Sequence, residues 1–360
     1  MAQMIKTLQV RLKDKHARVL SAMAREVNLL WNFCNETSQR AIRERRKFLS
    51  GFDLQKLTDG FSKCEGVQIG SATTQQVCEE YATRRRQFKK TRLNWRVSNR
   101  KSSRYSLGWI PFKSRALTYK AGQLRFCGVA LNVWDSYGLS QYEFRAGSFS
   151  EDSRGRWYLN VQVMLPELYG PVQPSPEAIR GIDLGMKTAI SCCDGPKFEG
   201  RIYRKHEAAL GVAQRAGKKD RVLAIHAKIA NTRKNALHKF SSELVKRSGA
   251  IFVGNVSSEA MIKTKKAKST LDAGWSMFKT MLEYKCSHAG VVFGEVNESY
   301  TTQTCSCCGE IPLSSPKGRA GLEIRCWTCS ECGAVHDRDV NAAKNIARRG
   351  LASLAEGALQ

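Results

Sequence analysis

The pattern of apolar and polar positions changes period twice in the first half of the chain. Residues 4–12 alternate in part, as a strand does, and from Asp14 apolar residues recur at helical spacing. A second helical pattern covers about 72–98, and a Gly-containing link with a short helical piece near Leu54 separates the two. Strand-like runs punctuated by glycine follow, at Tyr105–Ile110, Ala116–Tyr119, Leu124–Phe126, Leu139–Phe144 and Trp157–Met164. This order predicts a β-barrel with a helical insertion.

The second half begins after a proline-rich stretch, 166–176, which we interpret as a linker. Its pattern predicts, in order, a hairpin at 178–201, a long basic helix or helix pair at 204–248, a strand at 249–256, a helix at 271–289, a strand at 291–296 and a helix at 339–354. That order is compatible with an RNase H-like sheet.

The charge of the chain indicates a polyanionic partner. The 360 residues carry 59 Lys and Arg against 32 Asp and Glu, a formal net charge of +27, while 42% hydrophobic residues suffice for folded cores. Residues 1–120 alone hold 26 basic and nine acidic residues. A merely solvated surface or a membrane surface would also be basic, but nucleic acid fits this excess best. No apolar run reaches about 18 residues, and the N-terminus lacks the apolar region of a signal peptide.

Six of the 13 cysteines fall within 28 residues and predict a zinc ribbon. Cys305-x2-Cys308 and Cys329-x2-Cys332 are separated by twenty residues. Two such pairs bring four thiolates to one tetrahedral metal and leave no open position, so we expect one structural Zn²⁺. Cys307 and Cys326 are expected to be bystanders.

Two aspartate motifs suggest a second, catalytic metal site. Asp183 lies in the apolar strand Ile182-Asp183-Leu184-Gly185, where a buried carboxylate needs a cation or hydrogen bonds. Asp339 follows the last cysteine pair and opens a helix, where it could also be an N-cap. Two aspartates and one glutamate can hold two Mg²⁺ ions about 3.5–4 Å apart for phosphodiester hydrolysis.

Taken together, Gly181-Ile-Asp183-Leu-Gly185, the cysteine ribbon and Asp337-Arg-Asp339-Val-Asn-Ala-Ala resemble the C-terminal half of the TnpB family. These transposon-encoded, RNA-guided nucleases are related to type V CRISPR effectors. The resemblance implies an α+β, multi-domain fold with a wedge β-barrel (1–12 and 99–172), an inserted helical recognition lobe (13–98), a RuvC-like nuclease domain (178–302 and 336–360) and a zinc ribbon (303–335). It also implies a prokaryotic, cytoplasmic, nucleoid-associated protein.

One position departs from the family pattern. The family places a catalytic glutamate at the end of the strand that here reads Ile251-Phe-Val-Gly254, so a glycine stands where the acid is expected. Glu298, at the end of the neighbouring strand, is our preferred replacement. Glu259, Glu295 and a site without activity remain alternatives. Glu295 and Glu298 are three residues apart, so a regular strand would point them to opposite faces.

The resemblance implies RNA-guided cleavage of double-stranded DNA next to a short adjacent motif. The expected partners are a guide RNA and the target DNA, with no membrane partner. The protein is expected to be a monomer or homodimer. Alternatives are a guided DNA-binding repressor without cleavage, a compact type V CRISPR effector and a conventional transposase. Candidate nucleic-acid contacts, each also explicable as solvated helix faces or ribbon packing, are Arg84, Arg85, Arg86, Lys89, Lys90, Arg325 and Trp327. A basic run at Lys263–Lys268 could form a lid over the cleft.

Overall fold

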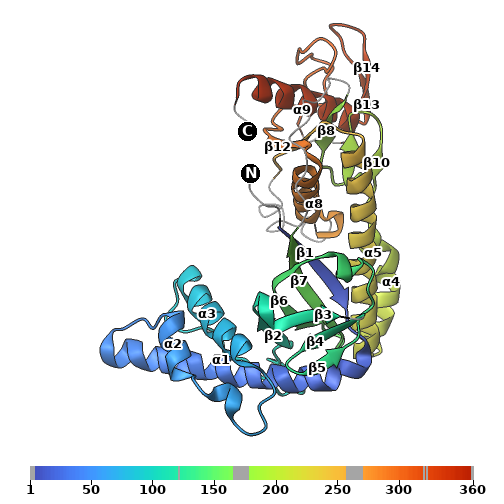
Figure 1. The fold of residues 1–360 in the computed structure, drawn as a ribbon. Helices are drawn as coiled ribbons and strands as arrows, with labels where there is room; N and C mark the ends of the chain where they lie inside the picture. The colour runs from blue at the N-terminus through green and yellow to red at the C-terminus, as the bar shows by residue number, and fades with distance from the viewer. Residues whose placement is uncertain are drawn as a thin grey trace. The chain divides into compact units, whose positions relative to one another are not determined.

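The computed structural model describes residues 5–120, 122–164, 178–256, 271–318, 321 and 323–357. The chain divides into two compact units, Met1–Glu167 and Leu168–Gln360, which we describe separately (Figure 1). The expected linker and the basic run at Lys263–Lys268 lie outside the described residues. Among the described helices, none is long and apolar enough to cross a membrane.

The first unit contains two antiparallel sheets around one aromatic core. The larger sheet has the order β1-β7-β6-β2, from strands β1 (Ile5–Arg11), β7 (Trp157–Met164), β6 (Phe144–Glu151) and β2 (Trp109–Phe112). The smaller one joins β3 (Leu117–Lys120), β4 (Gln123–Phe126) and β5 (Val129–Leu131). The rings of Phe112, Phe126 and Phe149 meet between the sheets at centroid distances of 5.0–5.9 Å. Closure of these sheets into a barrel stays a prediction.

Three helices interrupt this unit between β1 and β2, namely α1 (Ala17–Arg45), α2 (Gly51–Leu57) and α3 (Ser71–Gln87). The predicted helix over 72–98 is therefore wrong beyond Gln87. Lys89 adopts a left-handed backbone conformation with φ 50°, which ends the helix. The following segment is held non-helical because amide side chains of α1 bond its backbone: Asn35 donates to the Leu93 carbonyl at 2.8 Å, and Asn32 to that of Arg96 at 2.9 Å.

The predicted strand Leu139–Phe144 is also wrong, because its first residues form a 3-10 turn. Asp135 accepts hydrogen bonds from the backbone of Tyr137, Gly138 and Leu139, and this side-chain cap competes with strand pairing. The strand β6 that follows was missed because it lacks apolar alternation and contains a bulge between Phe144 and Gly147. The short 3-10 helices of this unit are Asp14–His16, Phe61–Lys63, Ser114–Ala116 and Leu139–Gln141.

The second unit is a five-stranded sheet with helices on both faces. Its order is β10-β9-β8-β11-β12, from β8 (Ile179–Asp183), β9 (Ile190–Cys192), β10 (Lys197–Phe198), β11 (Ala250–Gly254) and β12 (Val292–Val296). β8, β11 and β12 run parallel to one another, β9 is antiparallel to β8, and β10 is antiparallel to β9. The succession of hairpin, helices, strand, helix and strand along the chain is as predicted, while the RNase H-like assignment of the sheet stays a prediction.

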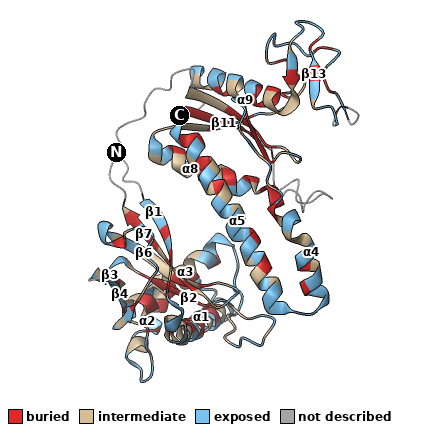
Figure 2. Ribbon diagram, turned by 90° about the vertical axis from the view of Figure 1, so that its right-hand side faces the viewer, coloured by how far each residue is buried: buried red, intermediate tan, exposed pale blue. Residues whose placement is uncertain are grey.

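Helices α5 (Lys219–Lys246) and α8 (Trp275–Ala289) cover one face of this sheet, and α9 (Arg338–Ala355) covers the other (Figure 2). α4 (Ile202–Arg215) packs on α5 through a small apolar cluster of its own. Between β12 and α9 the chain forms the cysteine-rich hairpin of β13 (Cys326–Thr328) and β14 (Val335–Asp337).

Candidate catalytic edge and cysteine cluster

Three parallel strands of the second unit end at one edge of the sheet. Asp183 is the last residue of β8, Gly254 is the last of β11, and Glu298 follows the end of β12 by two residues. β11 lies between the other two, with Val253 opposite Ile182 and Gly254 opposite Val296. The carboxyl ends of these strands therefore meet at one place, as in other α/β sheets that carry sites there.

Side-chain alternation puts Asp183 on the face covered by α9. A side chain at Gly181, two residues earlier on the same strand, would collide with the Ala343 carbonyl of α9. Ile182, between them, packs into the opposite core with α5 and α8. Glycine at 181 thus lets α9 approach the strand closely, and Asp183 faces the start of that helix.

Glu298 occupies the space that a side chain at Gly254 would fill. A Cβ built on Gly254 would lie 2.5 Å from Glu298 Oε2 and 3.2 Å from Glu298 Cβ. Glu295 lies on the other side, where its Oε2 accepts from Lys279 of α8 at 2.6 Å. The side chains of Glu295 and Glu298 therefore lie on opposite sides of the sheet, as expected. Glu259 lies outside the described residues.

Asp339 lies in the first turn of α9 but does not cap the helix. The N-cap is Asp337, whose Oδ1 accepts from the backbone of Asp339 and Val340 at 3.0 Å. Asp337 also pairs with Lys197 at 2.7 Å. The Asp339 carboxylate is thereby left free for other contacts, and it accepts from Arg325 at 3.1 Å.

Burial is the main influence on the ionisation of Asp183 and Glu298 at this edge. Burial, followed by the charges of Asp339 and Glu298, raises the pKa of Asp183 to about 7. Burial also raises the pKa of Glu298, against the opposing effect of Lys279. Burial acts to raise the pKa of Asp337 as well, but the Lys197 and helix N–H contacts outweigh it and lower that pKa. A cation between these groups would relieve their repulsion.

Two asparagines of α9 fix the loop that follows Glu298. Asn341 and Asn345 each donate to the carbonyls of Thr301 and Thr304, over 2.7–3.3 Å. Thr301 in turn donates through its Oγ1 to the Glu298 carbonyl at 2.8 Å. This role is not predicted from the sequence above, although two asparagines one turn apart on a helix are a pattern that indicates a shared partner.

Four cysteines gather in the hairpin between β12 and α9. The sulfurs of Cys305, Cys308, Cys329 and Cys332 all lie within 4.8 Å of one another. Two of the Sγ···Sγ distances are 3.6 and 3.8 Å, close to the edge of about 3.8 Å that a tetrahedron with Zn–S bonds of about 2.3 Å requires. Burial opposes ionisation of Cys305, but backbone N–H groups and His336 bring its pKa down to about 6.

The chemistry of this donor set fits a structural zinc, since four sulfurs surround one point and thiolates are its usual ligands. Cys307 and Cys326 are exposed and lie outside the group. The Nε2 atom of His336 lies 3.0 Å from Cys305 Sγ, and its ring packs 4.8 Å from that of Trp327.

The candidate nucleic-acid residues divide between surface and interior. Arg84, Arg86, Lys89 and Lys90 are exposed around the end of α3. Arg85 is buried, and its guanidinium bonds Ser38 Oγ and, at 2.6 Å, the Leu49 carbonyl. The structure therefore removes Arg85 from the expected contacts, because these bonds lie within the helical insertion.

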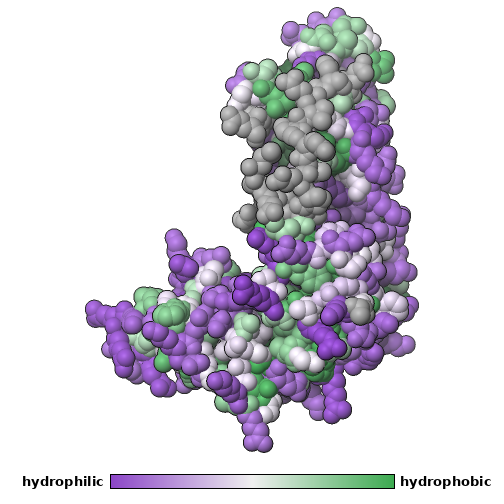
Figure 3. Space-filling model, in the orientation of Figure 1, coloured by the Kyte–Doolittle hydropathy of each residue, from purple (hydrophilic) through white to green (hydrophobic). Residues whose placement is uncertain are grey.

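The ribbon candidates are likewise engaged. Trp327 is buried against His336, and Arg325 pairs with Asp339. Stacking of Trp327 on a base is thus not available in this conformation. Hydrophilic side chains also line the edge of the second unit formed by α4 and α5 (Figure 3).

Comparisons with known proteins agree with this arrangement. The family described as Cas12f1-like, TNB domain, matches residues 275–346, from α8 into α9. A protein of Streptomyces pristinaespiralis named as an RNA-guided DNA endonuclease is 29% identical over 96% of this chain and 88% of its own length. InsQ of Escherichia coli, named in the same way, is 30% identical over 57% of this chain and 56% of its own length.

Among solved structures, the Cas12f1 chain of a Cas12f1–sgRNA–target DNA complex superposes with a TM-score of 0.59 at 12% identity, covering 96% of this chain and 99% of that one. This likeness shows a shared fold. Proteins of Acanthamoeba polyphaga mimivirus named TnpB-like also match, at 33% identity over 35% of this chain and 24% of their own length. The resemblance to the TnpB family expected from the sequence is confirmed: the chain is similar in sequence to proteins named RNA-guided DNA endonuclease or TnpB-like, and in fold to Cas12f1.

Proposed function

We propose that this protein is an RNA-guided endonuclease that cuts double-stranded DNA beside a short adjacent motif. One relative that matches across nearly the whole chain, and a second that matches over 57% of it, carry the name RNA-guided DNA endonuclease. The parallel order of β8, β11 and β12, with α9 packed on one face, supports a RuvC-type nuclease domain at 178–302 and 336–360. In such a nuclease the guide reads the sequence by pairing, while the protein holds backbone and shape.

The observation that carries the proposal is the position of Glu298. Its carboxylate oxygen lies where a glutamate side chain at Gly254 would begin, on the α9 face of the sheet and near Asp183. Asp339 contributes a third carboxylate from the first turn of α9. We therefore assign Asp183, Glu298 and Asp339 as the catalytic set, with the glutamate supplied by the neighbouring strand.

The donor set suits magnesium. Three carboxylates supply hard oxygen ligands, and the pKa of Asp183 is raised chiefly by burial and further by the charges of Asp339 and Glu298, so a bound cation would favour its ionised form. Two Mg²⁺ ions bound there would activate a water molecule and stabilise the leaving oxygen of the phosphodiester. In this scheme Thr301, Asn341 and Asn345 hold the Glu298 loop in place, and Lys197 with Asp337 fixes the start of α9.

The remaining assignments follow the same scheme. The ribbon at 303–335 would hold one structural Zn²⁺ on Cys305, Cys308, Cys329 and Cys332. The first unit would combine the wedge barrel, 1–12 and 99–172, with the recognition lobe, 13–98. Four exposed basic residues would contact the backbone of the guide RNA–target DNA duplex: Arg84, Arg86, Lys89 and Lys90. The protein would act as a monomer or homodimer.

The test is cleavage of a plasmid that carries a sequence matching the RNA that co-purifies with the protein. Glu298→Ala, Asp183→Ala and Asp339→Ala should each lower the cleavage rate by at least about a hundredfold, without additive loss in combination, because they act as one unit. Binding of RNA and target should persist. Glu295→Ala is the matched control, since that glutamate faces α8, and it should cut at the wild-type rate.

The relocation itself has a separate test. In the Glu298→Ala background, Gly254→Glu should restore part of the activity, because both positions reach the same space. Wild-type cleavage by Glu298→Ala would refute the relocated glutamate. Guided binding by the unmutated protein without any cleavage in Mg²⁺ would instead favour the repressor function.

A further inference from the structure

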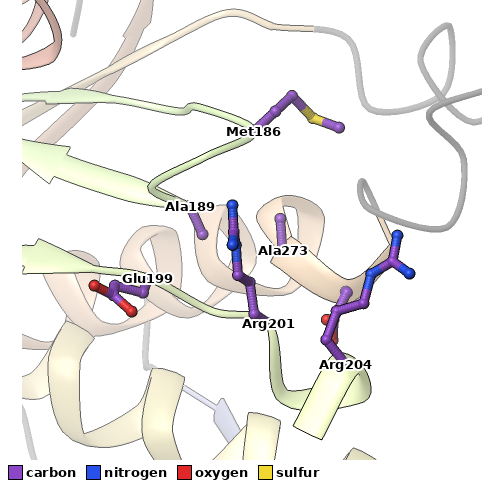
Figure 4. Close-up of a pocket in the computed structure, with 7 residues that line it drawn as sticks. Met186, Ala189, Glu199, Arg201, Arg204 and Ala273 are labelled. Carbon is purple, nitrogen blue, oxygen red and sulfur yellow. The ribbon is translucent and has the colours of Figure 1, made fainter. Parts of the chain in front are cut away.

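A pocket of about 380 Å³ opens in the second unit, on the loop between β8 and β9 and the start of α4 (Figure 4). Its volume lies at the lower end of the range of about 300–1,000 Å³ found for small-molecule sites. The lining combines small and apolar walls with four charged side chains: Met186, Ala189, Glu199, Arg201, Arg204, Asp272 and Ala273. None of these belongs to the catalytic set.

Asp272 lines this pocket and holds one buried oxygen without a hydrogen-bond partner among the described residues. The residue is 5% exposed, and its Oδ1 accepts from the Tyr203 backbone at 2.8 Å and from Arg233 at 2.9 Å. Its buried Oδ2 has no hydrogen-bond partner among the residues that the structure describes. A buried carboxylate oxygen without a donor is costly, so a ligand that brings an N–H group would be favoured.

Two arginines supply positive charge beside that acceptor. Arg201 extends between Ala189 and Ala273 with its guanidinium toward the loop of Met186, as Figure 4 shows, and it forms no ion pair with a carboxylate in the described part of the chain. Arg204, on the first turn of α4, pairs at the surface with Glu207 at 2.9 Å. Guanidinium groups suit phosphate and also stack on bases.

We propose that this pocket binds one unstacked nucleotide whose base carries an exocyclic amino group. The amino group would donate to Asp272 Oδ2, the base would lie against Met186 and the Arg201 guanidinium, and the phosphate would lie on Arg204. Single strands are recognised in this way, by splayed bases and arginine stacking. The nucleotide would belong to the guide RNA or to a DNA strand. The origin of the nucleotide rests on the proposed function, whereas the existence of the pocket does not.

The test needs no guide. Purified full-length protein is irradiated with 8-azidoadenosine monophosphate, and the attachment site is read by mass spectrometry. We expect attachment on the loop that contains Met186. Adenosine monophosphate should compete at a concentration about tenfold lower than uridine monophosphate, which lacks the exocyclic amino group. Equal competition by uridine monophosphate or by inorganic phosphate would overturn the proposal.

Variants distinguish nucleotide binding in this pocket from non-specific electrostatic binding of the nucleotide to a basic protein. Arg201→Gly should not strain the backbone, because Arg201 has a left-handed conformation with φ 55° that glycine adopts readily. Together with Arg204→Gln it should weaken labelling about tenfold. Lys205→Gln removes one positive charge from the same helix outside the pocket lining, and it should leave labelling unchanged. Equal loss in both variants would also refute the pocket.

Footprinting of the RNA-bound protein, before and after addition of target DNA, identifies the source of the nucleotide. One position, in RNA or in DNA, should become accessible in Arg201→Gly with Arg204→Gln but not in Lys205→Gln. No such position in either strand would overturn the proposal. Specific DNA cleavage by protein that carries no RNA would count against RNA guidance, whereas intact labelling of that same protein by the azido nucleotide would leave the pocket standing.

Discussion

At Asp183, burial and two neighbouring carboxylates favour the protonated acid. The folded, metal-free protein holds its pKa at about 7, against an ordinary value of 3.8. Below about pH 4 the group is protonated in both states. Between pH 4 and 7 the unfolded chain has released the proton while the folded chain keeps it, so this residue makes the free energy of unfolding fall as pH rises.

We therefore predict that, in Mg²⁺-free buffer, Asp183→Asn stabilises the protein more at pH 7.5 than at pH 5. Urea denaturation of both proteins at the two pH values measures the difference. Added Mg²⁺ should stabilise the wild type more at pH 7.5, where Asp183 is ionised, and should have less effect on the variant. A stability difference that does not change with pH would contradict the environment described for Asp183.

Arg85 and Arg86 are adjacent in sequence but have opposite surroundings. Arg85→Ala removes buried hydrogen bonds to Ser38 and to the Leu49 carbonyl, so we expect a loss of about 2–4 kcal/mol in the free energy of unfolding. Arg86→Ala, on the exposed side, should change stability by less than about 0.5 kcal/mol. Its RNA affinity should nevertheless fall. Thermal denaturation and filter binding of both variants distinguish these outcomes.

Sequence reasoning succeeded where chemistry is local and failed where it depends on tertiary contacts. The family resemblance indicated that an acid is missing at Gly254, and strand alternation separated Glu295 from Glu298, but the role of Glu298 stays a prediction. The burial of Arg85 could not be read from its charge, because it depends on Ser38 and on the Leu49 carbonyl, 47 and 36 residues away in the chain.

Among the elements, α9 is the one whose placement decides the geometry of the proposed catalytic edge. Glycines allow it to contact the sheet: Gly181 faces the Ala343 carbonyl, and a Cβ on Gly350 would collide with the Phe252 ring. Both contacts involve residues distant in sequence, so the pattern of α9 predicted a helix but not its close approach. The end of α3 at Gln87 has the same kind of cause, since Asn32 and Asn35 of α1 bind the chain beyond it.

Gly350→Ala should push α9 away from β11. We expect about 1–3 kcal/mol of destabilisation from overpacking and a cleavage rate lowered at least tenfold, because Asp339 moves with the helix. Gly211→Ala in α4 is the matched control. Its added Cβ would meet only the end of the Arg215 side chain, at 3.3 Å, so the helix should gain stability by up to about 1 kcal/mol. Equal effects of the two substitutions would refute this packing role.

At the scale of the whole molecule, the net charge of +27 should make the protein retain RNA during purification. We predict that it purifies with a discrete RNA, and that the affinity for this RNA falls steeply between 50 and 200 mM salt, by a factor of about 10³ or more. Sequencing of the bound RNA and salt titration of its binding measure both. Specific DNA cleavage by RNase-treated protein would contradict RNA guidance.

The proposed catalytic edge draws its carboxylates from distant parts of the chain. Asp183 lies on β8, whereas Asp339 arrives on α9, after the ribbon, and α9 also supplies the asparagines that hold the Glu298 loop. A ribosome must therefore synthesise more than 150 further residues after Asp183 before the edge can assemble. Under the proposed assignment, nascent or prematurely terminated chains that end before residue 338 lack Asp339, so we expect them to bind nucleic acid through their basic surface without cutting DNA.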